Sequence, residues 1–76
     1  MGFGDWIKRF MKKHKITQSK LSKKTGFSPN IIYFWHSGRN LPNGYSIAIL
    51  STALSSITGI KRKDILEEMV VAILKS

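Results

Sequence analysis

The sequence predicts an all-α fold, in which the 76 residues form one compact domain of five helices. Apolar residues recur at intervals of three and four along most of the chain, and this spacing places them on one face of a helix. Gly26, Gly38 and Gly59 interrupt these stretches where helices would end. The β-branched runs 31–35 and 69–73 do not alternate polar and apolar residues, so helices are favoured over strands there as well.

The first two helices are expected over residues 5–13 and 18–25. In the first, apolar side chains share one face and an acidic residue at the start suits the helix dipole. Thr17 is a good N-cap for the second helix, and Gly26 supplies the positive backbone angle that ends it. Leu21 is the expected inward anchor of this short helix.

The third helix is expected over residues 29–37, because Ser28 can cap it and a proline is favoured in the first turn. After a loop at 39–42, apolar residues between Ile47 and Leu54 predict a fourth helix that ends before Gly59. A fifth helix follows, and six apolar residues form a wide stripe along it: Ile65, Leu66, Met69, Val70, Ile73 and Leu74. No internal repeat, linker or low-complexity tract is evident.

The charge of the chain is strongly one-sided, with a net value of +9. Between Asp5 and Asp64 there is no carboxylate but there are twelve Lys and Arg residues. Like charges at this density repel one another unless a polyanion neutralises them, and nucleic acid is the densest common polyanion. An anionic membrane surface and an acidic protein remain alternative partners at this level of reasoning.

Catalysis and cofactor binding have no support in the sequence. The chain contains no cysteine, which excludes disulfides and thiolate metal sites. His14 and His36 lack acidic neighbours and are expected on the surface. No serine belongs to a histidine–carboxylate pattern. We therefore expect a protein that is not an enzyme and has no cofactor, metal or small-molecule substrate.

The chain also lacks the features of a secreted or membrane-spanning protein. No apolar run approaches the ~20 residues that a membrane span needs, and residues 1–8 lack the charge order of a signal peptide. A cytoplasmic location is therefore expected.

Two short helices joined by a tight turn containing glycine, at about 17–38, form the pattern that holds a recognition helix toward the DNA major groove. Nine residues here resemble the helix-turn-helix of the phage repressor and Cro-like family in type and spacing: Gln18, Leu21, Gly26, Ser28, Ile32, Trp35, Gly38, Arg39 and Pro42. The resemblance covers residues 16–54 and implies a five-helix, lambda-repressor-like domain that binds double-stranded DNA. Ser22 stands where the family commonly has alanine, and His36 where it often has glutamate.

Helical geometry predicts which side chains of the third helix could read DNA. Ile31, Ile32 and Trp35 share one arc and are expected to pack inward. Four residues then face the partner: Asn30, Tyr33, Phe34 and Ser37. Asn30 can pair with adenine, Phe34 can contact a thymine methyl group, and the Tyr33 hydroxyl can bind a base or a phosphate. The aromatic pair could instead belong to the core.

The remaining predicted contacts lie around this helix. Ser28 at its start can touch a base or a phosphate, whereas Pro29 offers apolar contact only. The family resemblance implies that Gln18 contacts the DNA backbone. The expected neighbours in that role are Lys20, Ser37, Arg39 and Asn40. Such contacts set register and affinity but carry little sequence information.

A 76-residue core can shelter only part of the stripe on the helix at 62–75, so the rest is expected to meet a second subunit. The predicted dimer interface consists of Met69, Val70, Ile73 and Leu74. Together with the resemblance, this favours a small Cro-like transcriptional repressor that binds a two-fold operator as a homodimer.

Two other functions remain open from the sequence. An antitoxin-type protein would use the apolar stripe of the last helix to grip a protein partner and would bind DNA to regulate its own synthesis. A cationic amphipathic protein would act at anionic membranes through the first helix, where Trp6 and Phe10 lie opposite basic residues.

Overall fold

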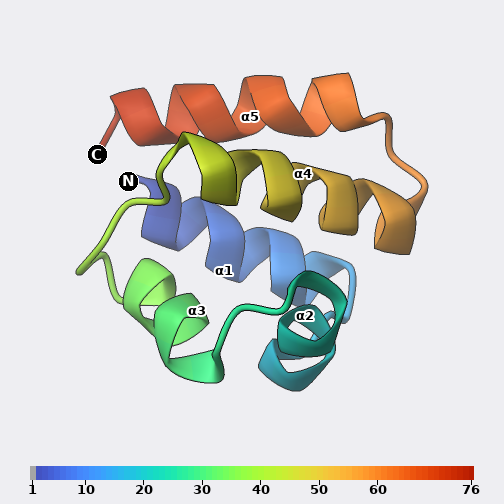
Figure 1. The fold of residues 1–76 in the computed structure, drawn as a ribbon. Helices are drawn as coiled ribbons and strands as arrows, with labels where there is room; N and C mark the ends of the chain where they lie inside the picture. Colours follow the sequence, from blue (N-terminus) through green and yellow to red (C-terminus); the bar gives the residue numbers. More distant parts are fainter. Residues whose placement is uncertain (1) are drawn as a thin grey trace.

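The computed structural model of the protein describes residues 2–76, and within that range it contains five α-helices and no strand (Figure 1). The helices are α1 (Phe3–Lys13), α2 (Gln18–Thr25), α3 (Pro29–His36), α4 (Gly44–Thr58) and α5 (Arg62–Leu74). The predicted all-α class and the number of helices are confirmed. None of these helices has the length and apolar character that crossing a membrane requires.

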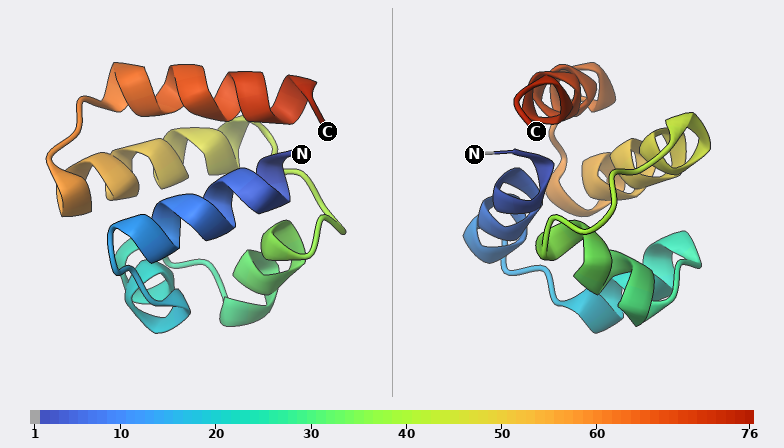
Figure 2. Two further views of the ribbon diagram at one scale, coloured as in Figure 1. Left: turned by 180° about the vertical axis from the view of Figure 1, so that it is seen from behind. Right: turned by 90° about the vertical axis from the view of Figure 1, so that its left-hand side faces the viewer.

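The helices form a closed ring around the core. α5 packs against α1 and α4, α1 packs against α3, α4 packs against α2, and the contact between α2 and α3 closes the ring. Figures 1 and 2 show α5 at one end of the molecule and the α2–α3 pair at the other, with α1 and α4 between them. The α2–α3 pair thus packs on one side against α1 and α4.

Hydrogen bonds at the helix ends explain why both ends of α2 and the start of α3 agree with prediction, whereas α3 ends at His36, one residue before the predicted end. The Thr17 hydroxyl accepts a bond of 3.1 Å from the backbone N–H of Lys20. The Ser28 hydroxyl accepts one of 3.3 Å from Ile31 N–H. Gly26 ends α2 with a φ of 83°, which a residue with a side chain rarely adopts.

The core is built from fourteen buried apolar side chains: Phe3, Ile7, Phe10, Met11, Ile16, Leu21, Ile32, Trp35, Leu50, Ala53, Leu54, Ile65, Met69 and Ala72. Phe3 begins α1 two residues before the predicted start, and its ring meets the edge of Trp35 at 6.4 Å. Gly4 lets α1 approach α3 closely, because a Cβ there would lie 2.7 Å from the Trp35 carbonyl oxygen.

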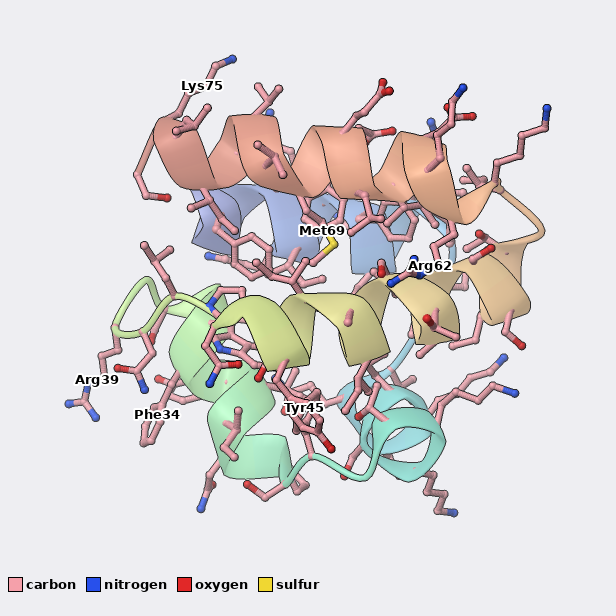
Figure 3. All side chains as sticks on the ribbon, turned by 45° about the horizontal axis from the view of Figure 1, so that its top comes forward. Phe34, Arg39, Tyr45, Arg62, Met69 and Lys75 are labelled. Atoms are coloured by element: carbon pink, nitrogen blue, oxygen red, sulfur yellow. The ribbon has the colours of Figure 1, made fainter. Side chains whose placement is uncertain are left out.

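Two predictions about apolar faces are wrong. Met69 is completely buried and points from α5 into the core, so it cannot contribute to a dimer interface (Figure 3). Ile31, expected to pack inward, is 40% exposed. α3 packs against α1 and α2, and these two helices cover only the arc that holds Ile32 and Trp35.

The helices α2 and α4 end in the same local structure, which is a repeat that the sequence analysis missed. In α2 the Ser22 hydroxyl donates to the Phe27 carbonyl at 2.6 Å, and in α4 the Ser55 hydroxyl donates to the Ile60 carbonyl at 2.6 Å. The shared sequence pattern is Leu-Ser-x-x-Thr-Gly followed by an apolar residue, at 21–27 and 54–60. Ser22, which stands where the family commonly has alanine, therefore stabilises the turn that leads into α3.

Candidate nucleic-acid interface

The turn between α2 and α3 is held rigidly, and this fixes the direction of α3. Phe27 packs against the Trp35 ring at 5.3 Å with an interplanar angle of 84°. Its backbone N–H donates to the Thr25 hydroxyl at 3.2 Å, and its carbonyl accepts from Ser22. Because the turn is bonded at both ends and packed on the core, α3 presents one constant face to solvent.

That face carries most of the predicted reading residues. Tyr33 is 55% exposed and so does not belong to the core. Pro29, Asn30 and Ser37 are exposed as well, and Phe34 is half-buried. The exposed side of Ile31 adds an apolar contact surface that the sequence analysis had assigned to the interior. α3 therefore offers one amide, one phenol and several apolar groups to a partner.

The loop after α3 is tied to that helix at Phe34. The Phe34 carbonyl oxygen accepts backbone bonds from Arg39 at 3.0 Å and Asn40 at 3.4 Å, and a third bond from the Ser37 hydroxyl at 3.1 Å. Arg39 and Asn40 are both exposed. Figure 3 shows Phe34 and Arg39 projecting next to each other from the edge of the molecule. The structure thus brings these predicted contact residues together.

Gln18 is joined to the end of α3 by a side-chain contact. Its Nε2 lies 3.3 Å from Nδ1 of His36, and Nε2 of His36 lies 3.0 Å from the sulfur of Met11. Burial, followed by the positive charge of Lys8, lowers the pKa of His36 below its usual value. The expectation of a surface His36 is therefore wrong.

The other histidine is not a free surface residue either. His14 is half-buried, and its ring packs at 4.5 Å from Phe10. Sequence reasoning could not find the partners of His36, because they lie on other helices, whereas Phe10 lies four residues before His14 and was a local signal that could have been used.

Lys20 and Ser28 are exposed on the same helix pair, at the first turns of α2 and α3. The N-terminus of α4 follows the Arg39–Asn40 loop directly and is capped by Asn43, whose Oδ1 accepts from Ser46 N–H at 2.8 Å. Tyr45 in the first turn of α4 is 72% exposed, lines a surface pocket with Lys24 of α2, and was not singled out from the sequence. An asparagine in the position of an N-cap was the signal that could have placed it at a helix start.

Residues 2–76 hold no group of three or more His, Asp or Glu side chains that could bind a metal ion. What the arrangement offers instead is an exposed helix held out by a rigid turn, next to exposed basic and amide groups, on a chain of net charge +9. These features suit a DNA duplex, whose major groove admits a helix and whose backbone attracts cations.

The fold and this site define a helix-turn-helix DNA-binding protein. Residues 7–60 match the family model described as helix-turn-helix, and the chain belongs to this family of XRE-type helix-turn-helix proteins. It is a DNA-binding transcription regulator of that type. The match ends before α5. No curated protein and no solved structure matches the chain.

Proposed function

We propose that this protein is a small Cro-like repressor that recognises a specific two-fold operator in double-stranded DNA as a homodimer. The observation that carries the proposal is the exposed face of α3, which projects from the α2–α3 pair beside the basic loop at Arg39. Repression would follow from occupying a promoter. Occupancy would then depend on the concentration of the protein.

The proposed contacts divide into two sets. Base edges in the major groove would be read by Pro29, Asn30, Tyr33 and Phe34. The DNA backbone would be bound by Gln18, Lys20, Ser37, Arg39 and Asn40. Ser28, at the start of α3, can serve either set. Within the set that would read base edges, Asn30 is the one residue whose side chain suits bidentate pairing with adenine, so base selection would depend strongly on it.

The proposed dimer uses the exposed apolar residues of α5. Val70 is 48% and Leu74 79% exposed, and Ile73 between them is half-buried. They lie toward the C-terminal end of α5. Although α5 and α3 are at opposite ends of the molecule, this end of α5 lies over α3, and the other end lies over α2 (Figures 1 and 2). Contact between two such ends would keep both α3 helices close to the two-fold axis. Recognition helices of such dimers lie about 34 Å apart, one turn of DNA.

Selection of bound sites from random duplexes tests this proposal directly. A two-fold repeated motif is the expected result, and a single unrepeated motif would contradict the dimer. With about six to ten phosphates neutralised by a dimer, log affinity should fall against log salt with a slope of roughly −5 to −9. A slope near zero on duplex DNA would remove the proposal altogether.

A second candidate function is an antitoxin-type interaction protein that represses its own synthesis. It is favoured by the position of α5, which lies outside the matched region and keeps Val70, Val71 and Leu74 exposed. A heterologous partner would then cover this face in place of a second copy. The purified chain would sediment as a monomer, and a protein from the native host would co-purify with it.

Action at anionic membranes loses its main support. Phe10 is buried in the core, and Trp6 is half-buried with its Nε1–H donating to Glu68 Oε1 at 3.0 Å. The apolar face of α1 therefore packs against the protein itself. An interfacial helix would need that face for the lipid.

A further inference from the structure

We propose that His36 is a positioning residue of the DNA interface, which sets the orientation of the Gln18 side-chain amide and, when protonated, turns that amide so that both of its N–H groups face DNA. The inference rests on the proposed function, in which Gln18 binds the phosphate backbone. It adds a residue that would not itself touch DNA and a dependence of affinity on pH.

The hydrogen-bond partners of the ring fit its neutral form. With the Gln18 amide nitrogen as the donor, Nδ1 of His36, 3.3 Å away, is the unprotonated, accepting nitrogen. The proton of the neutral ring then sits on Nε2, which faces the acceptor sulfur of Met11 at 3.0 Å. His36 is therefore a neutral ring with both nitrogens engaged, and it links α1, α2 and α3.

This arrangement occupies one of the two N–H groups of Gln18. One donor of the amide group that would bind a phosphate is therefore already engaged by His36. An imidazolium would reverse the contact, because its Nδ1–H needs an acceptor and the Gln18 Oε1 is the acceptor within reach after a half-turn of the amide. Both amide N–H groups would then be free for phosphate oxygens.

The surroundings keep the ring neutral in the free protein. Burial acts first, and the charge of Lys8 on α1 acts in the same direction, so the pKa of His36 is lowered. The groups that meet the ring from α2 and α1, Gln18 and Met11, carry no charge. No carboxylate contributes to the lowered pKa. Asp5, on α1, lines the same surface pocket as His36 and Lys8. A DNA phosphate bound at Gln18 would add a further negative charge near the ring.

The sign of the pH effect follows from linkage. A phosphate favours the imidazolium, so the pKa of His36 should be higher in the complex than in the free protein. Binding then takes up a proton, and affinity should rise as the pH falls through the pKa of the complex. A difference of about one pKa unit corresponds to a tenfold change in affinity per subunit.

Duplex binding measured between about pH 8 and pH 5.5 tests the inference, because this range spans the titration of histidine. The unaltered protein should gain affinity toward low pH, on the order of tenfold per subunit. The chain offers a matched control, since His14→Gln removes the other histidine and should keep the gain. His36→Gln should bind with little pH dependence. A His36→Gln protein that keeps the full gain would overturn the inference.

Two measurements separate the amide turn from a simple effect of added charge. Gln18→Ala should lose most of the pH response although His36 still titrates, whereas an unchanged response would show that charge alone is responsible. Nitrogen-15 NMR of the His36 ring should show the Nε2–H tautomer in the free protein and a pKa that rises on adding duplex. If neither the unaltered protein nor any variant binds duplex at any pH, the proposed function itself fails. Binding whose affinity does not change with pH contradicts only the inference about His36.

Discussion

The guanidinium carbon of Arg39 lies 5.2 Å from the centroid of the Phe34 ring, and the Arg39 backbone N–H donates to the Phe34 carbonyl oxygen at 3.0 Å. The two residues are thus joined through both side chain and backbone. A cation held against an aromatic face loses rotational freedom before it meets DNA. Phe34 would therefore hold Arg39 ready for the proposed phosphate contact, in addition to any contact of its own with a base.

Phe34→Leu should weaken binding to specific and scrambled duplexes by similar amounts, about 0.5–1 kcal/mol, because it removes the ring but keeps an apolar side chain. Binding titrations on both duplexes measure this. Arg39→Ala should also act on both duplexes, and the double variant should lose less than the sum of the two losses. A loss confined to the specific duplex would instead indicate that Phe34 reads a base.

Asn30→Ala should cost about 1–3 kcal/mol on the specific duplex and little on a scrambled one, because Asn30 is exposed on α3 and suited to bidentate pairing with adenine. The ratio of the two affinities is the quantity to compare. Should that ratio stay at the parental value, α3 does not read DNA through Asn30.

Local hydrogen bonding explains which parts of the fold could be predicted from sequence. The caps at Thr17 and Ser28 and the left-handed Gly26 act within a few residues, and the bounds predicted for α2 agree with the structure. The exposure of Tyr33 followed from helical periodicity in the same way. Such features need no knowledge of distant packing.

Features that depend on distant parts of the chain could not be predicted. The partners of His36 lie on α1 and α2, and nothing near position 36 in the sequence identifies them. The exposure of Ile31 depends on which arc of α3 is covered by α1 and α2. Met69 was assigned to the surface because periodicity identifies the stripe on α5 but not which part of it the core covers.

Gly4→Ala should lower the free energy of unfolding by about 1–3 kcal/mol, as overpacking typically does. A Cβ at Gly4 would lie 2.7 Å from the Trp35 carbonyl oxygen and 2.9 Å from that of His36, and both are backbone atoms that cannot rotate away. Gly44→Ala is the matched control, since a Cβ there meets nothing within 4 Å. Urea denaturation followed by circular dichroism gives both values. Equal stabilities for the two variants would mean that α1 can shift away from α3 at little cost.

The face of α5 that would form the dimer can be tested one residue at a time. Val70→Lys and Leu74→Lys place a charge at positions that are 48% and 79% exposed, so both variants should fold. Each charge would have to be buried in the proposed interface without a partner, which costs several kcal/mol. Sedimentation should therefore show monomers. Tyr45→Lys, at a residue that is 72% exposed and projects from α4 away from α5 (Figure 3), should leave the mass unchanged.

The same variants connect the interface to DNA binding. A folded monomer should bind a half-site weakly and lose the cooperative binding of the full two-fold site, because linkage of two half-site contacts supplies much of the affinity. Circular dichroism must show that each variant stays helical. Met69→Lys, at a completely buried position, should instead abolish the fold and serves as the reference for a core substitution. If Val70→Lys and Leu74→Lys remain folded, dimeric and fully active on the two-fold site, the subunits meet through a surface other than α5.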